Sequence, residues 1–304
     1  MVFGSFVVDL MGRAPHLPVP GETVKGSMFK MGPGGKGFNQ GVAAHKAGGL
    51  VTMVTKLGQD TFAGVALDAM NELHMDTTHI LSTPDSETGA ALIMVDETTS
   101  QNEIVVLPGA CSTITDREVD SLAPLLDDTG YLLTQLETNV SATERIIRMA
   151  HEKGVTVILN TAPVQPVSDE LLSKIDLITP NEVEAEILTG IPIENEEKAD
   201  EAADWFMSRG VKEVVITLGS RGVYLNDGKR RGILPAFRVN AIDTTGAGDA
   251  FNGGLVAGLA EGMDLWEAAR FANALAALSV QKLGTTPSMP DREDIDRFLE
   301  AHRE

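Results

Sequence analysis

The residues best suited to chemistry lie in one string near the C-terminal end, Asp243–Gly254 (DTTGAGDAFNGG), which leads into a helical pattern. Small residues at a helix start leave backbone N–H groups bare, with the positive end of the helix dipole behind them. Such a turn binds anions, and a carboxylate in it can take a proton from a hydroxyl group. We therefore expect Asp249 to be a general base, beside an anion hole formed by Gly246, Ala247 and Gly248.

A second glycine-rich segment, residues 34–40 (GGKGFNQ), precedes a helix of small residues at 41–47. Glycines allow a backbone to approach a ligand closely, and Lys36 and Asn39 offer hydrogen-bond donors to hydroxyl groups. This pattern indicates a site for a small polar molecule.

Residues 32–37 also satisfy G-x-G-x-x-G, with Asp60 at a suitable distance for the ribose-binding acid of a dinucleotide site. We disfavour this interpretation because Pro33 has no N–H to offer a pyrophosphate. The Walker A string and the H-R-D and D-F-G triplets of protein kinases are absent from the sequence, which argues against those two nucleotide-using classes.

The elements that must position these loops alternate between strand and helix from about residue 50. We predict strands at 50–57, 131–137, 155–160, 176–179 and 211–218, and helices at 61–73, 142–153, 182–188 and 292–302. This order predicts an α/β fold, with a largely parallel central sheet and helices on both faces. Ser141 and Glu144 predict a capping box, and Gly154 predicts the end of that helix.

Two segments, 10–32 and 88–108, interrupt the alternation. The second contains expected strands at 91–95 and 104–107 with no helix between them. We predict that both segments form a small antiparallel β lid over the carboxyl ends of the parallel strands, where ligands of such folds bind. The main domain would then comprise 1–9, 33–87 and 109–304. The apolar face of the lid would suit a homodimer contact, although a sheet lying flat on the body is the alternative.

The composition limits the partners. Of 304 residues, 24 are Lys or Arg and 44 are Asp or Glu, so the formal charge is −20, which disfavours nucleic acid. No apolar run reaches the ~18 residues that span a bilayer, and no basic-then-apolar leader opens the chain, so no membrane partner is expected. Cys111 is the only cysteine, which excludes an intrachain disulfide and fits a cytoplasmic protein.

In isolation, a Gly-x-Gly-Asp turn fits a simple helix cap as well as a catalytic site. The whole Asp243–Gly254 string, however, resembles the second signature of the PfkB-type carbohydrate kinases, and residues 34–40 resemble the first. Further stretches are similar to the ribokinase type in the same order: PGET at 20–23, QLE at 135–137, NTAP at 160–163, TPNEVEAE at 179–186, TLGSRG at 217–222 and GTTPS at 284–288. The resemblance implies a ribokinase-like fold that uses ATP to phosphorylate a sugar.

The resemblance also implies a role for each matching position. It implies sugar contacts for Asp9, Gly35, Lys36, Gly37, Asn39, Glu137 and Asp249, with Val7 facing the same site. It implies ATP contacts for Asn181, Thr217, Leu218, Gly219, Ser220, Arg221, Gly222, Gly248 and Asn273.

Two kinds of metal ion are implied in the same way. A monovalent cation, usually K⁺, would lie behind the anion hole at Asp243, Thr245, Ser279, Lys282, Gly284 and Ser288, mostly on main-chain carbonyls. Mg²⁺ would accompany ATP, and Asn181-x-x-Glu184 resembles a motif tied to it. Without the resemblance, that motif would be an ordinary helix N-cap.

The implied reaction is attack of a sugar CH₂OH on the γ-phosphoryl group of ATP, most simply the C5 hydroxyl of D-ribose to give D-ribose 5-phosphate. One position departs from the family, because Val7 stands where ribokinases carry an asparagine that faces the sugar. Valine cannot bond a hydroxyl, so 2-deoxy-D-ribose, or another sugar of the family, is an alternative substrate. A non-catalytic sugar-binding regulator is the alternative of another class, which the intact Asp249 and Lys36 disfavour.

Overall fold

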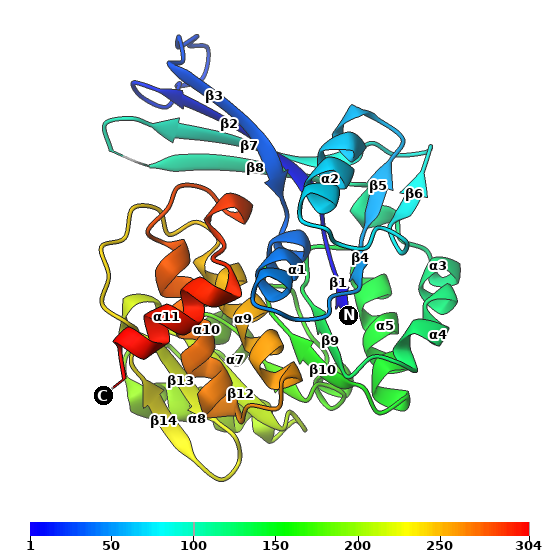
Figure 1. The fold of residues 1–304 in the computed structure, drawn as a ribbon, viewed down its shortest axis with the longest axis vertical. Helices are drawn as coiled ribbons and strands as arrows, with labels where there is room; N and C mark the ends of the chain where they lie inside the picture. Colours follow the sequence, from blue (N-terminus) through cyan, green and yellow to red (C-terminus); the bar gives the residue numbers. More distant parts are fainter. Residues whose placement is uncertain (100, 304) are drawn as a thin grey trace.

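The computed structural model describes residues 1–99 and 101–303, and an eight-stranded sheet is its centre (Figure 1). The strand order is β14 (Arg231–Leu234), β13 (Val223–Asn226), β12 (Glu213–Thr217), β11 (Leu177–Ile178), β10 (Thr156–Leu159), β9 (Tyr131–Thr134), β1 (Val2–Phe3) and β4 (Met53–Val54). Neighbours from β12 to β4 pair in parallel, while β13 and β14 continue the sheet antiparallel. The predicted, largely parallel central sheet is confirmed.

Helices cover both faces of this sheet, as predicted. Successive strand residues point to opposite faces, so Leu133 belongs to one buried cluster and Leu132 to the other. The first cluster is completed by α1 (Lys36–Lys46), α2 (Thr61–Glu72), α9 (Ala247–Ala260), α10 (Leu265–Ser279) and α11 (Arg292–Ala301). The second is completed by α3 (Asp116–Ser121), α4 (Ala123–Leu126), α5 (Val140–Glu152), α6 (Asp169–Leu172), α7 (Glu182–Thr189) and α8 (Glu196–Met207).

A second sheet stands off the body at the top of Figure 1. Its order is β3 (Met28–Gly34), β2 (Val7–Ala14), β7 (Thr88–Asp96) and β8 (Asn102–Gly109). Both outer pairs are antiparallel, as expected, but the central β2–β7 pair is parallel, because both strands leave the body in the same direction. The sheet also begins earlier than residue 10, so Val7 and Asp9 belong to it.

The predictions for individual strands and helix ends were only partly confirmed. The predicted strand at 50–57 is two short strands, β4 and β5 (Lys56–Gly58), and β5 pairs with β6 (Leu81–Thr83) in a separate small sheet. The predicted capping box of Ser141 and Glu144 is wrong: α5 is capped at Asn139 and begins at Val140, so Ser141 lies inside the first turn. Gly154, with φ of 74°, follows the end of α5 as predicted.

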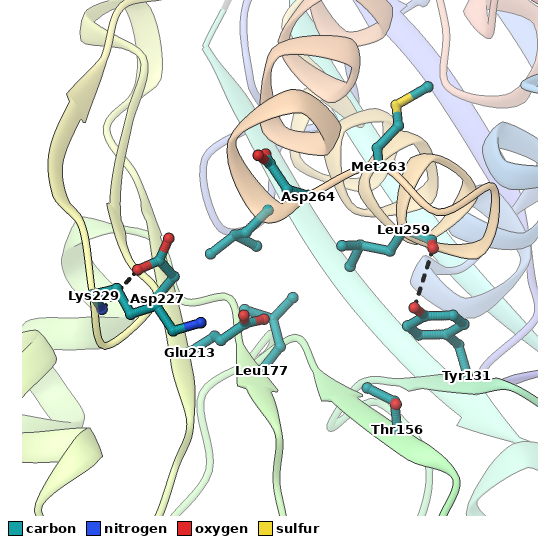
Figure 2. Close-up of a pocket in the computed structure, with 10 residues that line it drawn as sticks. Tyr131, Thr156, Leu177, Glu213, Asp227, Lys229, Leu259, Met263 and Asp264 are labelled. Carbon is teal, nitrogen blue, oxygen red and sulfur yellow. Dashed lines mark hydrogen bonds between the residues drawn. The ribbon is translucent and has the colours of Figure 1, made fainter.

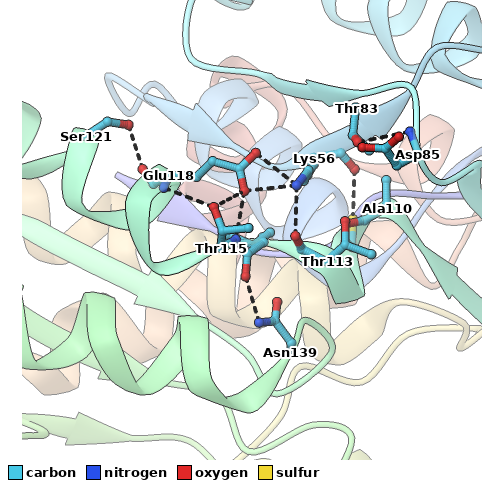
Figure 3. Close-up of polar contacts among 11 residues, drawn as sticks. Lys56, Thr83, Asp85, Ala110, Thr113, Thr115, Glu118, Ser121 and Asn139 are labelled. Atoms are coloured by element: carbon cyan, nitrogen blue, oxygen red, sulfur yellow. Dashed lines mark hydrogen bonds and ion pairs between the residues drawn. The ribbon is translucent and has the colours of Figure 1, made fainter.

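A buried lysine ties β5 to the segment that follows the second sheet (Figure 3). The ammonium of Lys56 donates to Thr113 O at 2.8 Å, in the short helix η1 (Ala110–Thr113), and lies 2.9 Å from the Glu118 carboxylate in α3. These bonds fasten the point where β8 returns to the body. Among the described residues, no helix is both long and apolar enough to cross a membrane.

Candidate active site

The turn that opens α9 has the form expected of an anion site. Gly246 is the N-cap, with φ of +76°, a conformation that glycine adopts without strain. The N–H groups of Gly246 and Gly248 form no hydrogen bond with residues 1–99 or 101–303. The Ala247 N–H instead donates to Thr244 O at 3.2 Å, so the expectation of three open amides holds for two in this conformation.

Asp249 lies in the first turn of α9 and is only 7% exposed. Two neutral amides hold its carboxylate: Asn39 Nδ2 donates to Oδ2 at 3.0 Å, and Gln40 Nε2 donates to Oδ1 at 3.0 Å. Burial raises the pKa of Asp249, and the charge of Lys36, followed by these two bonds, opposes that rise. A carboxylate with a raised pKa is a better proton acceptor, as a general base requires.

The side chain of Asn39 forms more hydrogen bonds within the protein than expected. Its Nδ2 serves Asp249, its Oδ1 accepts from Thr286 Oγ1 at 3.0 Å, and the residue is 4% exposed. Its clearest function is therefore to orient Asp249, and a sugar contact would have to use what remains of its bonding capacity.

The glycine loop before α1 packs against the segment that links β1 and β2. A Cβ at Gly37 would lie 2.5 Å from the carbonyl carbon of Gly4, so only glycine allows this approach. At the start of α1, the N–H of Lys36 donates to Glu137 Oε2 at 2.9 Å, and Ser5 Oγ donates to the same oxygen. Glu137 thereby joins three separate segments at one point.

Lys36 and Asp9 complete a charged cluster around Asp249. Burial alone would lower the pKa of Lys36, but the charges of Asp249, Glu137 and Glu184 raise it, so the ammonium stays protonated. Burial, followed by the charges of Glu137 and Asp249, raises the pKa of Asp9 to about 6. Four of the expected sugar-contact residues therefore interact electrostatically: Asp9, Lys36, Glu137 and Asp249.

Val7, in contrast, does not bring a polar group to this cluster. It is 3% exposed, and its Cγ1 would lie 2.9 Å from a Cβ built on Gly89, its partner in β7. The side chain therefore packs on the backbone of the neighbouring strand.

A cavity of about 510 Å³ reaches the N-terminus of α9, where Ala247 and Gly248, the two residues before Asp249, line it. Among the expected ATP contacts, its lining includes Thr217, Gly219, Ser220, Gly222, Gly248 and Asn273. Asn181, Leu218 and Arg221 do not line it. The sequence did not point to the apolar part of the lining outside the glycine string: Ala236, Phe237, Val239, Ala276, Ala277 and Val280. These residues belong to no polar motif, and an apolar wall has no sequence pattern that separates it from core.

Asn181 and Glu184 form a reciprocal capping box at the start of α7. Asn181 Oδ1 accepts from the Glu184 N–H at 2.8 Å, and Glu184 Oε2 accepts from the Asn181 N–H at 3.0 Å and from Thr161 Oγ1 at 2.9 Å. The ordinary N-cap interpretation is therefore correct as local structure. Because both Glu184 oxygens accept bonds from the chain, the site fits an indirect relation to Mg²⁺ better than direct ligation.

The positions expected for a monovalent cation lie on two adjoining segments, residues 243–245 and 279–288. Asp243 joins them, since its carboxylate accepts from the Thr245 N–H at 3.0 Å and from the Gly284 N–H at 2.9 Å. Ser279 and Ser288 donate their hydroxyls to nearby main-chain carbonyls. The oxygen-rich set fits a hard cation, whereas Lys282 would have only its carbonyl to offer.

A second cavity, of about 320 Å³, lies at the opposite edge of the sheet, where β9 to β12 begin (Figure 2). Two of the three acids that line it serve the fold: Asp227 accepts from Trp266 Nε1 at 3.1 Å, and Asp264 caps α10. None of the expected site residues lines it. The expected site residues therefore lie away from this cavity.

The chain is similar in sequence and in fold to several known sugar kinases. The chain is 42% identical to a ribokinase of Haemophilus influenzae over 299 residues, which cover 98% of this chain and 97% of that protein. It is 34% identical to a deoxyribokinase of Salmonella typhi, with 98% and 97% covered. A ribokinase structure from Thermotoga maritima has a TM-score of 0.90 at 34% identity, covering 98% of each chain. A ribokinase from Arabidopsis thaliana, complexed with ribose and ATP, has a TM-score of 0.90 at 31% identity, covering 98% of this chain and 97% of that one.

The fold and the family of its relatives thus define an α/β phosphotransferase, with a carboxylate beside a turn that has two open amides. Residues 1–292 match the family model described as pfkB family carbohydrate kinase, and the chain belongs to that family.

Proposed function

We propose that this protein transfers the γ-phosphoryl group of ATP to the C5 hydroxyl of D-ribose, giving D-ribose 5-phosphate. The observation that carries the proposal is the position of Asp249, which directly follows Gly248 of the cavity lining and interacts electrostatically with Asp9, Lys36 and Glu137. The ribokinase relatives, one of them complexed with ribose and ATP, support the choice of substrate.

In this proposal, ATP occupies the 510 Å³ cavity, with its adenine against the apolar wall and its phosphates at the α9 turn. The sugar lies against Asp9, Glu137 and the glycine loop. A loose phosphoryl transition state needs alignment and neutralised charge more than early deprotonation, so Asp249 takes the proton late. Lys36 and the open amides of Gly246 and Gly248 stabilise the charge that develops on the phosphoryl oxygens.

Two ions would assist. Mg²⁺ bound with ATP neutralises phosphate charge, and Asn181 and Glu184 would shape the surroundings of that ion from the start of α7. K⁺ would be held by the oxygen groups of Asp243, Thr245, Ser279, Lys282, Gly284 and Ser288, and would steady the loop that opens α9.

The second sheet would serve as the lid over this site and as a dimer contact. Phe29 is 69% exposed and Ile104 is 50% exposed, and both lie on strands of that sheet. They belong to a group of exposed apolar side chains on this sheet, which includes Met28, Met31, Val105 and Leu107, and such a group is typical of a surface that a partner covers.

The direct test is an ADP-release assay of the purified protein with Mg²⁺, with and without K⁺, against a panel of pentoses and hexoses. We expect ADP release with D-ribose and a product phosphorylated at C5. Sugar binding in calorimetry with no ADP release for any sugar would instead identify a non-catalytic regulator.

Val7 supports a second candidate substrate, 2-deoxy-D-ribose. The side chain offers no hydrogen bond, and a site that leaves a hydroxyl unpaired discriminates against it. The deoxyribokinase relative fits this alternative. Comparing kcat/KM for the two sugars distinguishes them: a preference for the deoxy sugar of roughly tenfold or more would replace ribose as the proposed substrate.

A further inference from the structure

A chain of buried side-chain amides lies behind Asp249. Gln40 Nε2 donates to Asp249 Oδ1 at 3.0 Å and to Asn160 Oδ1 at 3.1 Å, and Gln40 Oε1 accepts from Gln135 Nε2 at 2.6 Å. Asn160 Nδ2 in turn donates to Thr179 O at 2.8 Å. Gln40 and Gln135 are at most 1% exposed, and Asn160 is 7% exposed.

The carbonyl group of Thr179 determines the direction of every hydrogen bond in this series of amides. The carbonyl oxygen of Thr179 can only accept, so Asn160 must turn its NH₂ toward it and its oxygen toward Gln40. Gln40 must then present its NH₂ to both Asn160 and Asp249. The main chain thereby selects the amide orientation that Asp249 meets.

A neutral donor suits this position better than a cation would. The charged groups that act on Asp249 are Lys36, Glu137 and Asp9. A lysine bonded directly to Oδ1 would hold the proton acceptor strongly ionised, whereas an amide fixes its geometry with a weaker electrostatic effect. A bond that fixes the direction of the carboxylate with only a small loss of its basicity suits a late proton transfer.

We propose that Gln40, oriented by Asn160 and Gln135, is a positioning residue that aims the Asp249 carboxylate at the reacting hydroxyl. This proposal rests on the proposed kinase function. Gln135 Oε1 has no hydrogen-bond partner among the described residues, so Gln135 forms the less constrained end of the chain and should matter less than Gln40.

The test uses Gln40→Met, which keeps the length but removes the amide, and Gln40→Glu, which keeps the shape but adds a charge. For Gln40→Met we expect kcat to fall by about 10- to 100-fold, typical of groups that orient a reacting residue, with KM for ATP and sugar within about threefold. We also expect the acid limb of the kcat–pH profile to move to higher pH, because a bond to the ionised form is lost. Gln40→Glu should move that limb further, because two carboxylates about 3 Å apart resist joint ionisation.

Asn226→Leu is the matched control. Asn226 is a buried amide that accepts from the Gly228 N–H at 3.0 Å, and it pairs with Val214 toward the opposite edge of the sheet. The Asn226→Leu variant should be less stable than wild type but should keep its kcat and its kcat–pH profile. Gln135→Met should lower kcat less than Gln40→Met.

Melting curves identify the variants that fold. Asn160→Ser tests the same series of hydrogen-bonded amides at the side chain that bonds Gln40 rather than Asp249. If wild-type protein phosphorylates no sugar, the proposed function fails. If wild-type protein is active and folded Gln40 variants keep kcat and the acid limb, or change only KM for the sugar, the positioning role is overturned.

Discussion

Lys56, which is buried, and Lys36, which is partly buried, differ in how the fold uses their charge. The side chain of Lys56 is 5% exposed, and its ammonium is paired with Glu118 and with the carbonyl of Thr113 (Figure 3). Lys36 faces Asp249 and Glu137, yet within the described part of the chain no ion pair includes it. A buried charge whose partners all lie in the fold stabilises the fold, while one without a close partner is available to a ligand.

The carboxylates near the two lysines, Glu118 and Asp249, also differ in their pKa values. Although partial burial raises the pKa of Glu118, hydrogen bonds from Lys56 and Thr115 lower it overall, so this carboxylate is stabilised as an ion. The pKa of Asp249 is raised, because burial outweighs the opposing charge of Lys36. The first carboxylate is a stable counter-ion, and the second can accept a proton. The predictions below test this division.

The largest expected effect is that of Asp249→Asn. An asparagine fills the same space but cannot accept the proton, so kcat should fall by a factor of roughly 10² to 10⁴, with ATP affinity nearly unchanged. Steady-state ADP release and nucleotide titration measure the two quantities. Near-normal turnover would remove Asp249 from the role of base.

Lys36→Met should rank next. Loss of the cation removes stabilisation of the phosphoryl charge, so we expect kcat/KM to fall by about 10²-fold, with little change in melting temperature. Asp249 needs to be ionised, and without Lys36 its pKa rises further, so the acid limb of the kcat–pH profile should move to higher pH. A large loss of stability with normal activity would mean that Lys36 is a structural lysine like Lys56.

Lys56→Met should give the opposite result. It leaves Glu118 without its partner, and since Glu118 is partly exposed we expect a loss of about 2 kcal/mol in unfolding free energy, less than for a fully buried pair. The folded fraction should retain kcat. Urea denaturation measures the loss, and the double variant Lys56→Met/Glu118→Leu should recover part of it. An unchanged midpoint would show that the pair contributes little.

The sequence predicted the elements that share a repeating pattern. Strand and helix alternation was sufficient for the parallel sheet and for helices on both its faces, and the glycine strings marked the two loops that meet at Asp249. The parallel pairing of β2 with β7 was not predictable, because it depends on where two distant segments leave the body.

Two features of the site were also beyond the sequence. Gln40 is one residue from Asn39, but only the packing of α1 against α9 turns it toward Asp249 and Asn160. The engagement of the Ala247 amide depends on how the preceding turn closes. Such contacts carry no motif of their own, because their partners are distant in the chain.

The smallest expected effect is a pH-dependent gain in stability from Asp9→Asn. The pKa of Asp9 is raised from 3.8 to about 6 in the folded protein, so its ionisation favours the unfolded chain. Wild-type stability from this group is fully present below pH ~4 and is lost as pH rises through about 6. The variant should therefore match wild type near pH 4 and exceed it by about 1 kcal/mol near pH 8, after allowance for solvent screening of a partly exposed group. Urea midpoints across that range measure the gap, and Asp68→Asn, an exposed carboxylate on α2, is the control. An equal stability difference between the variant and wild type at pH 4 and pH 8 would mean that Glu137 and Asp249 do not destabilise the charge of Asp9. Lys36 would then already compensate for the whole cluster.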